Sequence, residues 1–161
     1  MRTPLADLPL SHRLFLAAYR WRRSAPVAAA ALRAPLHRCR VALVTTAGLV
    51  APGDAPFDRD VRGGDWSWRT IPADVDPRAL TCHQRSDAFD RGPLTADVNV
   101  AFPIARLAEL AAAGAIGAVA PRHLSFMGSI TAPARLTRES APAAAAQLAA
   151  DQVDVALLVP V

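Results

Sequence analysis

Short, uninterrupted apolar runs indicate the buried strands of this chain. Residues 40–46 (Arg-Val-Ala-Leu-Val-Thr-Thr) and residues 153–159 are brief and rich in β-branched side chains. Runs of this kind are typical of strands that are covered on both faces. Ala115–Ala120, which Pro121 ends, predicts a third strand of the same type. Together these segments predict a parallel sheet.

Helical periodicity separates these strands. Residues 103–113 carry apolar side chains at helical spacing, with Pro103 in the first turn and Gly114 after the last. Residues 139–150 predict an Ala-rich helix, with Pro142 in its first turn. Strand–helix–strand crossovers within one sheet give parallel, right-handed units. The sequence therefore predicts an α/β fold, a single three-layer domain with a mostly parallel, Rossmann-like sheet.

Two weaker patterns predict additional strands. Trp66–Ile71 alternates in polarity and is closed by Pro72, and Leu80–His83 is a short candidate. The connecting segments are rich in Pro, Gly and charge and are predicted as loops: 51–65, 84–98 and 121–137.

The first forty residues differ in charge from the remainder. Residues 1–40 hold eight Arg and one acid, a net of +7, whereas residues 41–161 hold ten Arg and thirteen acids, a net of −3. Two short helices are expected in this part, at 11–22 with Ser11 as N-cap and at 26–32. We expect two parts, an Arg-rich helical arm at 1–39 and an α/β domain at 40–161. The arm either docks to an acidic surface, RNA or a partner subunit, or is a solvated amphipathic helix.

Composition narrows the class of protein. All 18 basic residues are Arg, which makes the basicity a weak indication of nucleic-acid binding, and no nucleic-acid partner is expected. The two cysteines, Cys39 and Cys82, have neither C-x-x-C nor zinc spacing, so we expect no metal site and a reducing cytoplasm. No apolar run reaches the roughly 20 residues that span a bilayer. Neither a G-x-G-x-x-G nor a Walker pattern occurs. An unprotected terminal strand favours self-association, so a homo-oligomer is expected.

In an open α/β sheet, ligands bind outside the carboxyl ends of the strands. Hydroxyl, imidazole and carboxylate side chains follow the predicted strands, and we expect them to form one polar pocket. Its expected members are Thr45, Thr46, Cys82, His83, Asp87, His123, Met127 and Gly128.

Each of these residues has a structural alternative. His83 and His123 are candidate acid–base residues because imidazole changes charge near neutral pH, but either one can instead be structural or merely solvated. Cys82 is a candidate nucleophile beside His83, although neighbouring strand residues point to opposite faces. Asp97 and Asn99 either bind substrate with the amino end of the 103–113 helix, or simply cap that helix.

Several blocks of the chain together resemble one known family. They are Val41–Gly48, Trp68–Pro72, Cys82-His83, Asp97–Leu107, Gly114–Gly117 and His123–Gly128. The chain from about residue 40 to residue 161 is similar through them to the selenoprotein B family of the glycine, sarcosine, betaine and D-proline reductases.

The resemblance implies a reductive C–N bond cleavage. In such enzymes a selenocysteine or cysteine follows the strand that Val153–Val159 matches. Its selenolate attacks the carbon that bears the amino group and displaces the amine, and a nearby thiol resolves the adduct. The resemblance also implies other reductase subunits, one of them with a pyruvoyl group, a small amino-acid-like substrate, and a thioredoxin-like or dithiol reductant. No cofactor bound by this chain itself is expected.

The chain departs from the family pattern at three places. Cys82 and Ser86 stand where the family has Ser and Tyr, and the loop at Gln84-Arg85 lacks paired glycines. The selenocysteine or cysteine is expected after Val161, as in a selenoprotein truncated at a codon that is ordinarily read as stop. The alternatives are a non-catalytic assembly module that docks to a partner subunit through the arm, and a cysteine enzyme that uses Cys82.

Overall fold

A computed structural model describes residues 8–19, 30–86 and 89–161 of the chain. It separates into two compact units, Met1–Ala31 and Leu32–Val161. In the first unit, α1 spans Leu10–Ala18. The helix expected at 11–22 is thus present, but it begins one residue before the predicted cap, Ser11. Pro9 precedes it, and residues 20–22 lie outside the described part of the chain.

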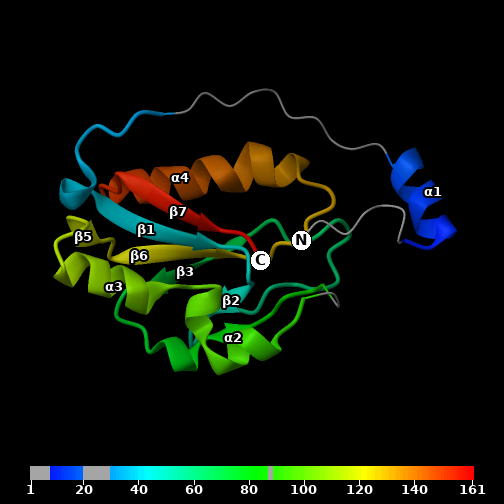
Figure 1. Ribbon diagram of the computed structural model, residues 1–161, viewed down its shortest axis with the longest axis horizontal. Helices are drawn as coiled ribbons and strands as arrows, with labels where there is room; N and C mark the ends of the chain where they lie inside the picture. Colours follow the sequence, from blue (N-terminus) through cyan, green and yellow to red (C-terminus); the bar gives the residue numbers. More distant parts are fainter. Residues whose placement is uncertain (1–7, 20–29, 87–88) are drawn as a thin grey trace. The chain divides into compact units, whose positions relative to one another are not determined.

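The second unit is built on a mixed, mostly parallel sheet around β1, which spans Arg40–Thr45 (Figure 1). Along one edge β1 pairs with β7 (Val155–Val159) over five residues, from Val41 opposite Val155 to Thr45 opposite Val159. Its other edge pairs with β5 (Ala118–Val119) and then with β6 (Arg122–Phe126). All three of these pairings are parallel. The strands expected at the start and at the end of the domain are therefore confirmed, and the one expected at 115–120 is present over Ala118–Val119.

Helices α3 and α4 lie on opposite faces of this sheet. Ile71 belongs to the apolar core together with Ile104 and Leu107 of α3, which spans Ile104–Ala112. The next residue, Thr70, contacts Gln147 of α4, which spans Ala141–Ala150. Because neighbouring residues of a strand point to opposite faces, the two helices cover different faces. The second unit therefore has three layers, with the sheet between α3 on one face and α4 on the other.

Shorter elements connect these layers. β2 (Leu49–Val50) and β4 (Thr81–Cys82) pair with each other as a two-stranded antiparallel ribbon. The helix α2 (Gly92–Ala96) precedes α3. Single turns complete the set: η2 at Leu36–Arg38, η3 at Pro77–Ala79, η4 at Val98–Val100 and η5 at Leu136–Ser140, the last of which leads into α4.

The structure corrects four of the expected elements. β3 (Trp68–Pro72) joins the sheet next to β6 but runs antiparallel to it, so the sheet is not purely parallel. β4 is a strand but pairs with β2 outside the main sheet. The expected loop at 121–137 contains β6, because pairing with β1 stops after Val119 but resumes at Leu124. In the second expected helix of the arm, 26–29 lie outside the described residues, and 30–32 are not helical.

Candidate functional site

The carboxyl ends of β1 and β7 are joined by Thr46. Its backbone N–H donates to the carbonyl of Val159 at 3.2 Å. Its hydroxyl accepts from the N–H of Val161 at 3.0 Å and lies 3.2 Å from the carbonyl oxygen of the same residue, to which it can donate. The tail after β7 is thereby held across the end of the central strand.

Gln84 fastens the loop after β4 to the same place. Its side chain is 2% exposed, and its amide nitrogen donates to the carbonyl of Thr46 at 3.1 Å. Its side-chain oxygen accepts from the N–H groups of Arg85 at 2.8 Å and Ser86 at 3.3 Å. Arg91 donates to the backbone carbonyl of Gln84 at 2.7 Å. Because the amide nitrogen and oxygen of this buried side chain are both hydrogen-bonded, Gln84 fixes the loop against the end of β1.

Gly128 permits this close packing. It has a φ of +67°, and a Cβ atom there would stand 2.8 Å from the Thr46 carbonyl oxygen and 3.2 Å from the Gln84 amide nitrogen. No L side chain fits that position without movement of the backbone. The loop after β6 therefore touches both Thr46 and Gln84, and the three loops that follow β1, β4 and β6 meet at one point.

A cavity of about 460 Å³ opens beside this point. It is lined by Gln84, Ser86, Phe89, Asp90, Ser129 and Val161. One oxygen of the Asp90 carboxylate accepts from the N–H of Gly92 at 2.9 Å, which orients the group. A carboxylate, hydroxyl groups and an aromatic ring around a volume of this size suit a small polar or cationic molecule.

A second cavity, of about 640 Å³, lies on the other side of the 82–91 segment. Cys82 and Arg91 line this second cavity, whereas Gln84 and Asp90 of the same segment line the first. Asp97 and Asn99 also line it. Of the predicted site residues, Cys82, Asp97 and Asn99 thus line the second cavity, and none lines the first.

Asp97 and Asn99 serve as caps. The Asp97 carboxylate accepts from the backbone N–H and the side-chain amide of Asn99, and these bonds hold the pKa of Asp97 below its usual value. The side-chain oxygen of Asn99 accepts from the N–H of Ala105 in the first turn of α3 at 3.0 Å. Asn99 thus satisfies an N–H group at the start of α3, Asp97 caps the preceding turn η4, and substrate binding by the pair stays a prediction.

Cys82 and His83 point to different partners. The Cys82 thiol donates to the carbonyl of Ala47 at 3.2 Å. The Nε2 atom of His83 lies 3.1 Å from the hydroxyl of Thr81, and its backbone N–H donates to Gly48. The half-buried imidazole is therefore available at the surface of the ribbon, while the thiol faces inward.

His123 lies inside the sheet. It is fully buried, its Nδ1 atom accepts from the N–H of Leu43 at 3.0 Å, and its ring meets Phe102 edge-on. Burial lowers the pKa of His123 to about 4, so the ring is neutral at physiological pH. In this structure His123 acts as a core hydrogen-bond acceptor, and its role in catalysis stays a prediction.

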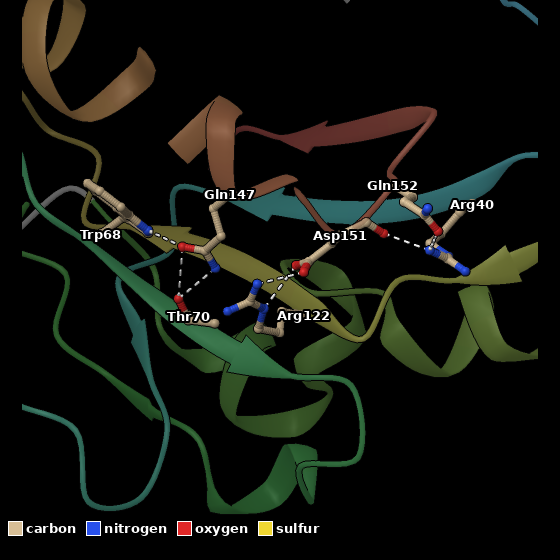
Figure 2. A network of polar contacts seen from close by, with 7 residues as sticks. All are labelled: Arg40, Trp68, Thr70, Arg122, Gln147, Asp151 and Gln152. Atoms are coloured by element: carbon tan, nitrogen blue, oxygen red, sulfur yellow. Dashed lines mark hydrogen bonds and ion pairs between the residues drawn. The ribbon is translucent and has the colours of Figure 1, made fainter. Parts of the chain in front are cut away.

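A separate polar network closes the amino ends of the strands (Figure 2). Arg122 binds the Asp151 carboxylate through two nitrogens, at 2.6 and 2.9 Å, which holds the pKa of Asp151 below its usual value. Arg40 donates to the carbonyl of Asp151 at 2.7 Å. Arg122 therefore binds a carboxylate of its own chain. This ion pair lies at the end of the sheet opposite to Thr46.

Comparison with known proteins decides the family. The family model described as glycine/sarcosine/betaine reductase selenoprotein B matches residues 9–160. The chain belongs to this family. No solved structure matches the chain significantly.

One curated protein similar to this chain is the D-proline reductase subunit gamma of Acetoanaerobium sticklandii. The two are 36% identical over 118 residues, which are 73% of this chain and 47% of the relative. The chain thus spans about half the length of the curated relative that it matches.

The structure brings some of the predicted site residues together and keeps others apart. Thr46 and Gly128 meet at the carboxyl end of β1. Thr45 is buried there and accepts from the N–H of Ala47, and Met127 packs in a small apolar cluster with Val50 and Phe57. Asp87 lies outside the described residues.

Sequence reasoning missed the cavity residues Gln84, Asp90 and Ser129. The place of Gln84 in a loop after a strand was the one signal that pointed to it. Within the described residues, no group of three or more His, Cys, Asp or Glu side chains suits a metal ion, and no helix is long and apolar enough to cross a membrane.

Proposed function

We propose that this chain forms the α/β body of a reductase subunit that cleaves a C–N bond in a small amino-acid-like substrate. The observation that carries the proposal is the position of Val161. It is bonded to Thr46 at the carboxyl end of β1 and lines the 460 Å³ cavity. A residue joined to Val161 would therefore stand at the entrance of that cavity, where ligands bind in open α/β sheets.

The lining of the cavity suits the substrates of this family. The Asp90 carboxylate, oriented by Gly92, attracts the cationic amine of an amino-acid-like molecule. The Phe89 ring lines the same space and supports a cation through its π face. We therefore assign Asp90 and Phe89 to binding of the amine, opposite Val161.

A selenocysteine or cysteine after Val161 fits this place. Gln84 and Ser129 give the cavity a polar wall, and Gln84 is itself buried and fixed. A selenolate or a thiolate supplies a soft nucleophile that is ionised near neutral pH. The chain's own contribution is to hold the tail through Thr46, to orient the amine through Asp90, and to fix one wall of the cavity through Gln84.

The remaining parts of the reaction would come from partners. A subunit with a pyruvoyl group would activate the substrate amine, and a thioredoxin-like protein or small dithiol would supply the two electrons. We place this assembly in the cytoplasm, because a dithiol donor requires a reducing compartment.

An extended chain tests the proposal. We would join Gly-Cys after Val161 in a Cys82→Ser background and add the pyruvoyl subunit, dithiothreitol and each of glycine, sarcosine, betaine or D-proline. Cleavage that depends on both the dithiol and the added thiol supports the proposal. The matched control carries Ser in place of the added Cys and should be inactive. No cleavage of any of the four substrates would contradict it.

Disulfide trapping tests the geometry without activity. The added thiol should cross-link to Ser129→Cys in the first cavity but not to Thr95→Cys in the second cavity. Equal cross-linking at both sites would show that the tail does not point into the cavity beside Val161.

Helix α1 favours a second role in assembly. Leu10, Leu14 and Phe15 are each more than 60% exposed, an unusual state for three large apolar side chains of one short helix. Docking of α1 to a partner subunit would cover them. Co-purification of the full chain with a pyruvoyl subunit, lost in a Leu14→Glu/Phe15→Glu variant that keeps its fold, would support this role.

A further inference from the structure

The outer edge of β7 is open. β7 pairs with β1 along five residues, and within the described part of the chain it has no second strand partner. In Figure 1 it forms the margin of the sheet, beyond β1. The backbone groups directed away from β1 are therefore free to pair with another strand.

The middle of β7 is exposed on both faces as well. Leu157 is 45% exposed and Leu158 is 68% exposed. As neighbours in a strand, they point to opposite faces of the sheet. Val155 is two residues from Leu157, on its face, and packs against the core that contains α3. Neither α3 nor α4 thus extends far enough to shield the strand.

The edge has none of the usual protection. Residues 155–159 read Val-Ala-Leu-Leu-Val, with no charge, proline or glycine. Natural edge strands are guarded by such residues or by a covering element, because bare edges aggregate. Parallel sheets in particular are covered on both faces. This composition indicates a strand that is buried in the working protein.

The topology shows what kind of element would cover it. The chain passes from β6 through α4 to β7 on the opposite side of β1. In doubly wound sheets this reversal is followed by further strands outward on the new side. A second copy of this chain, paired β7 to β7 about a two-fold axis, would satisfy the edge but would bring no helix over Leu157 or Leu158.

We propose that the open edge of β7, with its exposed faces, is the docking surface for a strand–helix segment of a reductase subunit of this family, whose strand continues the sheet in parallel. The curated relative matches this chain over only 47% of its own length, so more than half of it is available for such a segment. The surface is distinct from the proposed cavity and requires no catalysis.

Hydrogen exchange tests the proposal. The probe is the portion of the D-proline reductase subunit gamma that lies outside the match, joined after Val161 by a flexible Gly/Ser linker. The same portion is also supplied as a separate polypeptide, in case the fusion does not fold. In at least one form, the amides of residues 155–159 should exchange about tenfold more slowly than in the chain alone, a change of about 1.4 kcal/mol.

Two variants with charged substitutions locate the surface. Leu158→Glu should restore fast exchange, whereas the matched control Leu110→Glu, on the exposed side of α3, should not. Unchanged exchange in both forms of the probe would overturn the proposal. So would a dimer of the 161-residue chain that protects β7 and that Leu158→Glu dissociates, because a second copy would then be the occupant. Neither result depends on substrate, reductant or a reactive residue, so failure here is distinguishable from failure of the proposed function.

Discussion

The Nδ1 atom of His123 accepts a hydrogen bond from the backbone N–H of Leu43 at 3.0 Å. β1 pairs with β5 as far as Val41 and with β6 from Val44 onward. Leu43 lies in the gap between the two pairings, and the imidazole takes the place of the missing strand partner. An acceptor at Nδ1 fixes the neutral tautomer with its proton on Nε2. A buried side chain thus completes the ladder of the central strand.

This arrangement predicts acid sensitivity. The pKa of His123 is about 4 in the folded chain and 6.5 in its ordinary state, because burial disfavours the charged ring. The unfolded chain therefore binds the extra proton first, and stability is complete above pH 6.5 and is lost as the pH falls toward 4. The free energy of unfolding should decrease by about 3 kcal/mol across this window. Urea unfolding at pH 7 and at pH 4.5 measures most of this change.

His123→Asn is the control for that profile. The Asn oxygen can accept from Leu43 but does not titrate. The variant should have a lower free energy of unfolding than the parent at pH 7. This free energy should change little between pH 6.5 and 4.5. The Asp151 carboxylate has a lowered pKa, so its contribution is lost only below about pH 4 and does not obscure the comparison. An equally steep profile in both proteins would assign the sensitivity to other groups.

At Gly128, addition of a single methyl group should lower the free energy of unfolding. A Cβ there would stand 2.8 Å from the Thr46 carbonyl oxygen, in addition to the strain of a φ of +67°. Gly53 has a φ of +87° but nothing within 4 Å of such an atom. Gly53→Ala should cost about 1 kcal/mol from backbone strain alone, and Gly128→Ala about 1–3 kcal/mol more. Equal losses of unfolding free energy would show that the contact with Thr46 relaxes freely.

The fold could be predicted largely because its strands and helices are locally specified. Val41–Val44 and Val155–Val159 are apolar and β-branched, and Pro103 and Gly114 bracket α3. The direction of β3 was not predictable in the same way. Its alternating pattern suits either orientation, and its pairing with β6 depends on contacts distant in the sequence.

The candidate site was predictable only in part, for a similar reason. Thr46 and Gly128 follow strands and lie where the strand ends predicted them. His123 also looked like a rim residue, because Pro121 suggested the end of a strand, yet β6 continues past it and draws its ring into the core. Gln84 owes its place to three separate loops, and nothing in its local sequence carries that information.

The ion pair between Arg122 and Asp151 (Figure 2) should contribute more to stability than an exposed pair elsewhere in the chain. Arg122 and Asp151 form a two-point contact in which the Asp151 side chain is only 9% exposed, whereas Arg135 and Glu139 are each 51% exposed on one helical face. Asp151→Asn should lower the free energy of unfolding by about 1–2 kcal/mol, and Glu139→Gln should lower it by less, because water screens the exposed pair. Thermal unfolding of both variants at low and high salt measures the difference. A larger loss for Glu139→Gln would contradict the assigned role of Asp151 in joining α4 to β6.

The tether at Thr46 predicts a local change with little global effect. Thr46→Val keeps the shape of the side chain and the bond from its N–H to Val159, but removes both contacts of its hydroxyl with Val161. The free energy of unfolding should change by about 1 kcal/mol or less, since this site is partly exposed. The Val161 amide should exchange several-fold faster.

Thr45→Val is the matched comparison for this tether. It removes the buried hydroxyl that accepts from Ala47 and should lower stability while leaving the Val161 amide protected. In the extended chain, Thr46→Val should also reduce cross-linking of the added thiol to Ser129→Cys, because a released tail samples more positions. Unaltered exchange and cross-linking in Thr46→Val would mean that the strand itself, rather than this hydroxyl, directs the tail to the cavity.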